Sequence, residues 1–164
     1  MDSAWIEKLA IQELCARYAH AIDDLDMEDW VQCFTLDGGF QVADWVIRGH
    51  LALREYAAVH VGEVRCRHMT GNLLYEVHEN EATGQSSVLA TLATPGGYKI
   101  FGQGRYVDRL VKQNGQWRFA HRRVDVDSLV SDPAKIVMLA DPDVAPFIQP
   151  LIDAARRLGE QVQS

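Results

Sequence analysis

The stretch IQELCARYAHAIDDLDMEDWVQCF, residues 11–34, decides the fold. Its apolar side chains recur at three- and four-residue spacing, which places one apolar stripe along a helix. The stripe consists of Leu14, Cys15, Tyr18, Ile22 and Leu25. The acidic run 23–26 (DDLD) then breaks the spacing. The stretch therefore predicts two helices joined by an acidic elbow, the first ending near residue 23 and the second spanning about 27–35.

The second helix has its own start signal. Asp26 is a plausible N-cap, and Asp29 stands three residues later in the capping-box position. Trp30, Cys33 and Phe34 then form the face that we expect to be buried.

Tyr18 and Asp23 place polar tips beside the apolar wall of the first helix. Burying a carboxylate without a partner is costly, so Asp23 is a poor choice for stability alone. We therefore expect Asp23 to have a partner elsewhere in the chain.

The remaining sequence alternates between strand patterns and turn residues. We expect a first strand over residues 40–47 after a turn at 37–39, a helix over 50–60, and four longer β segments over 66–79, 86–94, 98–111 and 116–127. Gly102 and Gly104 predict a bend or bulge, and Asn114-Gly115 predicts a hairpin. This order indicates an α+β domain, a curved antiparallel sheet that wraps around three helices from the N-terminal half into a cone with an open mouth.

We assign residues 1–130 to the cone domain and residues 131–164 to a C-terminal extension. The extension contains four prolines followed by a helical run, Leu151 to Val162. We expect it to pack on the body or on a neighbouring subunit, or to cover the mouth of the pocket.

Composition excludes several classes of function. The formal net charge is -7 and no basic run occurs, which argues against nucleic acid as a partner. Three cysteines without CxxC spacing make disulfides and a zinc site unexpected and suit a reducing cytoplasm. The sequence shows no signal-peptide pattern and no apolar segment near the roughly 20 residues that span a bilayer, so we expect a cytoplasmic protein without a membrane partner.

An ordered set of short motifs carries a family resemblance. The set consists of Tyr18, Asp23, Asp26, Trp30, Phe34 with Asp37, Arg67-His68 with Asn72, Gly104-x-Tyr106-x-Asp108, and Gly115-x-Trp117-Arg118. Together they resemble the SnoaL-like branch of the nuclear-transport-factor-2-like superfamily, over roughly Ala4 to Asp127. The resemblance implies the same cone-shaped α+β barrel. It says less about the reaction, because one fold hosts many functions.

The resemblance also implies a catalytic pair. Members such as scytalone dehydratase, hexachlorocyclohexane dehydrochlorinase and bile-acid 7α-dehydratase hold an Asp–His couple inside the cone, at positions that match Asp23 and His68 here. A neutral imidazole can take a proton from carbon if its other nitrogen donates to a carboxylate. Tyr18 would then donate a hydrogen bond to a carbonyl or leaving oxygen. The alternatives are a helix-capping Asp23, a hydrogen-bonded core His68 and a Tyr18 that only packs.

Further side chains are candidates for substrate binding. The expected pocket walls are Phe34, Phe40, Trp45, Tyr98 and Phe101. Asn72 lies on the same predicted strand face as His68 and could orient substrate or satisfy backbone groups. Arg122 and Arg123 lie on opposite faces of the last strand, and we expect solvent around either. The remaining histidines lack ligand spacing, so we expect no metal and no cofactor.

The resemblance predicts a cofactor-independent lyase or isomerase acting on a small, largely apolar, ring-containing molecule. One alternative is a polyketide-cyclase or hydrolase type of enzyme using the same pocket. Another is a non-catalytic binding protein, or an assembly partner like the small subunit of a ring-hydroxylating dioxygenase. A homodimer or homotrimer is expected by the same resemblance.

Overall fold

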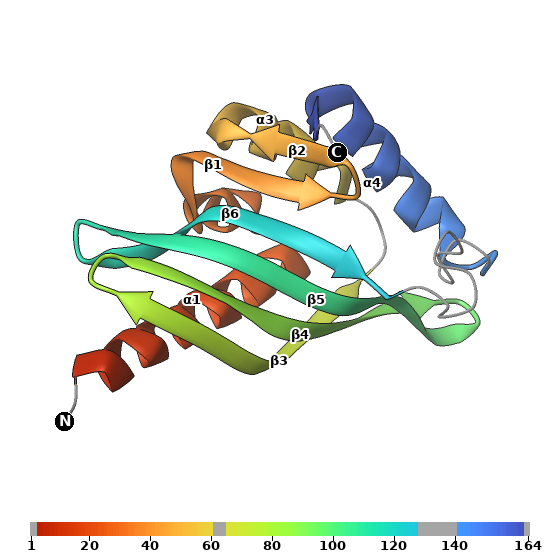
Figure 1. The fold of residues 1–164 in the computed structure, drawn as a ribbon. Coiled ribbons are helices and arrows are strands. Elements are labelled where there is room, and N and C mark those ends of the chain that lie inside the picture. The colour runs from red at the N-terminus through yellow and green to blue at the C-terminus, as the bar shows by residue number, and fades with distance from the viewer. Residues whose placement is uncertain (1–2, 61–64, 128–140, 163–164) are drawn as a thin grey trace.

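Seven strands form one curved sheet in the computed structural model, which describes residues 3–60, 65–127 and 141–162 (Figure 1). The strand order is β3-β4-β5-β6-β1-β2-β7. The strands are β1 Phe34–Val42, β2 Trp45–Arg48, β3 Cys66–His78, β4 Glu81–Thr94, β5 Gly97–Gln113, β6 Gln116–Val126 and β7 Glu160–Gln161. All neighbouring strands run antiparallel except β1 and β6, which are parallel.

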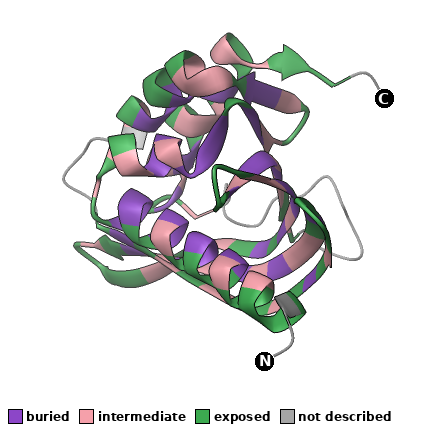
Figure 2. Cartoon of the chain, turned by 90° about the vertical axis from the view of Figure 1, so that its left-hand side faces the viewer, coloured by how far each residue is buried: buried purple, intermediate pink, exposed green. Residues whose placement is uncertain are grey.

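The described part of the chain also contains four α-helices, namely α1 Ser3–Asp23, α2 Met27–Gln32, α3 Gly49–Ala57 and α4 Ala145–Leu158. Helix α1 packs on β3 and β6, α3 packs on β1, and α4 packs on α3 and β2. In Figure 2 the sheet curves around the helices, and the buried residues gather between the two layers. This arrangement confirms the α+β fold with a curved, unclosed sheet around helices.

The apolar stripe of α1 enters the core as expected. Leu14, Cys15, Tyr18 and Ile22 are all buried, and Ile11 joins them one turn earlier. Burial of this face, rather than intrinsic helix propensity, provides most of the stability of such a helix.

The acidic elbow ends α1 with a left-handed residue. Leu25 has φ +61°, the Asp26 N–H donates to the Ala21 carbonyl at 2.8 Å, and the Leu25 N–H donates to the Ile22 carbonyl at 3.3 Å. This is the hydrogen-bond pattern of a Schellman cap. It leaves the carbonyl of Asp23 without a partner inside the helix.

The predicted cap of the second helix is confirmed. The Asp29 N–H donates to Asp26 Oδ1 at 3.0 Å. Helix α2 ends at Gln32, earlier than predicted, because the chain turns directly into β1 at Phe34.

The prediction of a turn at residues 37–39 is wrong. These residues lie inside β1, at a register irregularity against β6 between Phe34 and Gly39. A Cβ on Gly38 would meet the Phe119 carbonyl oxygen at 2.8 Å, so glycine here allows two backbones to approach. The glycines mark a bulge in a strand and not its beginning.

The long hairpins follow the sequence signals closely. Asn114 and Gly115 have φ +52° and +78°, as a two-residue hairpin turn requires. A register shift opposite Ala90 makes Phe101 the extra residue of a bulge beside Gly102, which confirms the predicted irregularity in β5.

The C-terminal helix begins earlier than predicted. Helix α4 starts at Ala145 because Pro146 lies in the first turn, where a missing N–H costs nothing. Ile148, Ala154 and Ala155 are buried against the body. Residues 128–140, which include the first ten residues of the extension, lie outside the described residues.

All three cysteines are free and buried. Among the described helices, none combines the length and apolarity needed to cross a bilayer.

Candidate active site

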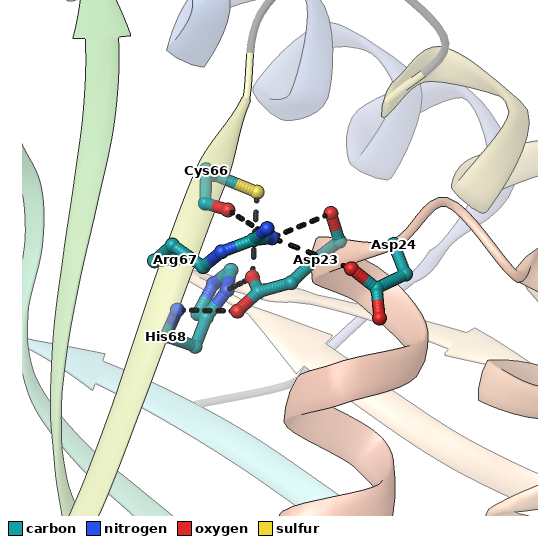
Figure 3. Close-up of polar contacts among 5 residues, drawn as sticks. All are labelled: Asp23, Asp24, Cys66, Arg67 and His68. Atoms are coloured by element: carbon teal, nitrogen blue, oxygen red, sulfur yellow. Dashed lines mark hydrogen bonds and ion pairs between the residues drawn. The ribbon is translucent and has the colours of Figure 1, made fainter.

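Asp23 and His68 meet where the end of α1 reaches the start of β3. Asp23 Oδ1 lies 2.7 Å from His68 Nδ1, and Asp23 Oδ2 accepts the His68 backbone N–H at 2.8 Å (Figure 3). Both side chains are nearly buried, with 6% of Asp23 and 10% of His68 exposed. The partner that Asp23 needed is therefore His68, 45 residues away in sequence.

The contact fixes the chemistry of the imidazole. A carboxylate can only accept hydrogen bonds, so Nδ1 of a neutral His68 carries the proton and Nε2 keeps its lone pair. Within residues 3–60, 65–127 and 141–162, no hydrogen bond reaches His68 Nε2. The ring edge packs against Phe101 at a centroid distance of 5.6 Å and an interplanar angle of 89°. The His68 imidazole is therefore fixed in orientation, and its Nε2 lone pair is available to accept a proton.

His68 lines a cavity of about 540 Å³. Aromatic and aliphatic side chains from the sheet and from α1, α2, α3 and α4 form most of its wall, including Tyr18, Trp30, Phe40, Tyr56, Phe101 and Tyr106. Gln41, Asp44, Gln103, Arg123 and Asp125 supply polar groups elsewhere on the wall. This size and lining are typical of a site for a small organic molecule.

Tyr18 also lines this cavity. Burial raises the pKa of its hydroxyl to about 12, although the positive charge of Arg122 acts in the opposite direction. Tyr18 therefore stays protonated at neutral pH and can donate a hydrogen bond into the cavity.

The predicted substrate-binding residues divide into two groups. Phe40 and Phe101 line the cavity. Phe34 is fully buried behind the lining, with its ring 6.0 Å from Tyr18, and Trp45 pairs with Gln161 of β7. Neither Phe34 nor Trp45 is among the residues that line the cavity.

Tyr98 and Asn72 lie outside the cavity lining as well. Tyr98 is 87% exposed near the tip of the β4–β5 hairpin. Asn72 is exposed, with φ +51°, and its side-chain amide donates to Ser87 Oγ at 3.4 Å.

A bulge in β3 explains the position of Asn72. The pairing with β4 shifts between Gly71 and Leu74, so the buried face changes from Cys66 before the shift to Tyr75 after it. Strict alternation placed His68 and Asn72 on one face, whereas a bulge inserts a residue and reverses the alternation.

The arginine prediction is wrong for Arg122. Its guanidinium is fully buried and binds Asp108 through two hydrogen bonds of 2.8 Å. The cation lies 3.8 to 4.3 Å from the ring centroids of Phe119, Tyr106 and Tyr18. Cation–π contact and a bidentate carboxylate offset the loss of water around Arg122. Arg123, in contrast, is partly exposed and pairs with Asp125 at 2.6 Å.

Sequence reasoning also missed site residues. Trp30 and Tyr106 were noted as a buried helix residue and as part of a motif, yet both line the cavity, as do Ile148, Leu151 and Ile152 of α4. The apolar spacing of α4 was the available signal, but spacing does not say which surface a helix covers.

Asp23, Cys66 and His68 bring three possible metal-ligand atoms within 4.8 Å of one another. The 2.7 Å between Asp23 Oδ1 and His68 Nδ1 fits a hydrogen bond, whereas ligands of one tetrahedral zinc lie about 3.3 Å apart. Burial and the negative charge of Asp23 raise the pKa of the Cys66 thiol to about 11, which disfavours the thiolate that a metal prefers. The geometry fits an acid–base pair better than a metal centre.

Comparison with known protein families identifies the family of this chain. The family model described as the SnoaL-like domain matches residues 5–123, most of the chain. The chain belongs to the SnoaL-like domain family. A search of curated protein sequences gives no significant match.

Solved structures extend the comparison. Rv3472 from Mycobacterium tuberculosis, a protein of unknown function, is 56% identical, with a TM-score of 0.97 over 99% of this chain and 96% of that one. A candidate scytalone dehydratase from Novosphingobium aromaticivorans is 24% identical, with a TM-score of 0.71 over 77% and 88% of the two chains. The beta subunit of a candidate aromatic-ring-hydroxylating dioxygenase from the same organism is 22% identical, with a TM-score of 0.71 over 78% and 94%. The latter two similarities establish the fold alone.

Proposed function

We propose that this SnoaL-like protein is a cofactor-independent lyase or isomerase that acts on a small, largely apolar, ring-containing molecule. The observation that carries the proposal is the 2.7 Å contact between Asp23 and His68 at the wall of an apolar cavity. The scytalone dehydratase name carried by one structural neighbour agrees with a dehydratase-like elimination.

His68 is the general base in the proposed reaction. Its free Nε2 takes a proton from a substrate carbon, while Asp23 keeps Nδ1 protonated and stabilises the imidazolium that forms. The electron pair of the broken C–H bond becomes the new double bond as the C–O bond breaks. His68 then gives its proton to the leaving hydroxide, so water is released and the imidazole returns to its neutral form.

Tyr18 stabilises the oxygen on which charge develops. Its hydroxyl is buried at the cavity wall and remains protonated, since burial raises its pKa to about 12. A donor fixed in a dry cavity stabilises a developing oxyanion more than water does. In an isomerisation, the same donor would bind a carbonyl oxygen.

The pair can be tested without knowing the natural substrate. The protein is incubated in D2O with a panel of hydroxylated and keto ring compounds, and deuterium incorporation and loss of water are followed by NMR and mass spectrometry. We expect Asp23→Asn and His68→Ala each to reduce turnover of an accepted compound by about 10²- to 10⁴-fold while the fold is retained.

The chain offers matched controls for both variants. Asp153→Asn alters an exposed aspartate of α4, and His78→Ala alters an exposed histidine of β3, the strand that carries His68. These two variants should keep full turnover. Activity in Asp23→Asn and His68→Ala equal to that of the unmodified protein would reject the assignment.

A non-catalytic role is the second candidate, favoured by the dioxygenase beta subunit among the structural neighbours. A purely structural subunit does not need a buried acid–imidazole contact in an apolar cavity, so we rank this role lower. Stable copurification with a larger subunit, together with no turnover, would favour it. A polyketide-cyclase or hydrolase reaction would use the same cavity and the same panel would detect it.

We also propose a cytoplasmic homodimer or homotrimer. Large apolar side chains are exposed on β3 and β5, namely Met69, Leu74, Tyr98 and Ile100. Exposed apolar groups of this kind mark interaction surfaces when they are contiguous. Light scattering of the purified protein gives the molar mass, and a monomer at micromolar concentration would contradict the proposal.

A further inference from the structure

We propose that Cys66 and Arg67 are positioning residues that hold Asp23 against His68. The inference deepens the proposed function, since it concerns the same pair, but its test measures the imidazole itself and needs no substrate. Cys66, Arg67 and His68 are consecutive at the start of β3, and each contacts Asp23 at the end of α1 (Figure 3).

Cys66 acts on the side chain of Asp23. Its thiol donates to Asp23 Oδ1 at 3.6 Å, the same oxygen that accepts His68 Nδ1–H. Burial and the Asp23 charge raise the pKa of this thiol to about 11, so the proton stays on sulfur. Together with the His68 backbone N–H on Oδ2, the carboxylate receives three donors from one strand segment. Three donors of fixed position leave the carboxylate little freedom to rotate.

Arg67 acts on the backbone of Asp23. Its Nη1 donates to the Asp23 carbonyl at 3.0 Å and to the Cys66 carbonyl at 3.2 Å, and lies 3.5 Å from Asp24 Oδ1. The Asp23 carbonyl is one of the helix-end acceptors that the Schellman cap leaves open. A cation at a helix C-terminus also interacts favourably with the helix dipole.

The position of Arg67 follows from the sheet. Side chains alternate along a strand, so Cys66 and His68 face α1 while Arg67 starts on the opposite face. Among the described strands, β3 lies at the edge of the sheet, so its free side has no paired strand. The guanidinium reaches around this edge and ties the strand to the helix, which sets the distance between the two catalytic groups.

The test is ¹⁵N NMR of histidine-labelled protein without substrate. In the unmodified protein we expect His68 in the Nδ1–H tautomer, with a slowly exchanging Nδ1 proton. In Cys66→Ala and in Arg67→Met we expect this proton to exchange about tenfold faster, because each removes a contact that holds the acceptor. Cys66→Ser keeps a donor and should restore slow exchange.

Matched variants separate positioning from general loosening of the fold. Cys33→Ala removes another buried thiol, which donates to the Asp29 carbonyl. Arg54→Met removes another partly exposed arginine that joins two elements, through Glu28 at 2.7 Å. Both should leave the His68 proton unchanged.

The outcomes are distinct. Unchanged exchange in both Cys66→Ala and Arg67→Met overturns the inference, and so does equal acceleration in the two control variants. Failure to find any turnover would count against the proposed function, while the NMR result would still decide whether these residues position the pair.

Discussion

Arg122 and Arg123 are adjacent in sequence and opposite in environment. The first is fully buried against Asp108, and the second pairs with Asp125 near solvent. Removing one partner of a buried ion pair leaves an uncompensated charge, whereas an exposed pair contributes little.

We expect Arg122→Met to lower the free energy of unfolding by about 3–5 kcal/mol, since Asp108 would remain buried without its counter-ion. Arg123→Met should change it by no more than about 1 kcal/mol. Urea denaturation measures both. The double variant Arg122→Met/Asp108→Leu should recover part of the loss, and equal effects of the two single variants would contradict the assignment.

His121 gives a prediction for pH. Burial lowers its pKa in the folded protein, and the positive charges of Arg48, Arg109 and Arg123 lower it further. The unfolded chain therefore binds a proton at His121 more readily, beginning near the ordinary value of about 6.5. Above the unfolded-state pKa of about 6.5, His121 is neutral in both states and does not change the free energy of unfolding. As the pH falls from that pKa toward the lowered pKa of the folded state, protonation of His121 in the unfolded chain lowers the free energy of unfolding.

We expect the free energy of unfolding to decline between about pH 7 and pH 5.5, and His121→Gln to flatten that decline. Urea denaturation at several pH values measures it. The control variant His78→Gln alters an exposed histidine and should leave the slope unchanged. An identical slope in His121→Gln would refute the argument.

At the level of elements, two glycines of the long strand β5 differ in how closely they approach the neighbouring strands. A Cβ on Gly104 would lie 2.0 Å from the Asp125 carbonyl oxygen of β6, while a Cβ on Gly102 would meet, among the described residues, only Ala90 Cβ at 3.6 Å. The first position requires the absence of a side chain, and the second does not.

We expect Gly104→Ala to lower the free energy of unfolding by about 1–3 kcal/mol, because the β5–β6 pairing must shift. Gly102→Ala should stay within about 0.5 kcal/mol. Thermal or urea unfolding of the two variants tests this contrast. A tolerated Gly104→Ala would mean that the backbones at this point can separate without cost.

At the level of the whole molecule, the C-terminal helix contributes to the wall of the cavity. Ile148, Leu151 and Ile152 of α4 line it, and β7 pairs with β2 just after the helix. The family match ends at residue 123, so this part of the wall comes from outside the matched region.

We expect removal of residues 145–164 to open the cavity and expose its aromatic lining, which increases the fluorescence of a bound apolar dye and lowers Tm. Removal of residues 160–164 alone takes away β7 but keeps α4, and should leave dye binding near its original level. A full truncation that binds no more dye would show that α4 does not close the cavity.

Local sequence signals predicted the elements well. The apolar stripe of α1, the Asp26 cap and the Asn114-Gly115 turn all depend on neighbours within a few residues, so the sequence contains the required information. The family resemblance supplied the expectation that Asp23 and His68 meet, which spacing alone could not provide.

The sequence by itself determined the α+β class, the boundary between α1 and α2, and the Asn114-Gly115 hairpin, because periodicity and turn chemistry are local. Only the tertiary structure decided which face each strand presents after a bulge, as at Asn72, and which arginine is buried. It also decided that Ile148, Leu151 and Ile152 of α4 belong to the cavity wall. Those outcomes depend on contacts between segments far apart in the chain. The free energy of burial and of strand pairing depends on the partner segment, and a local sequence pattern does not identify that segment.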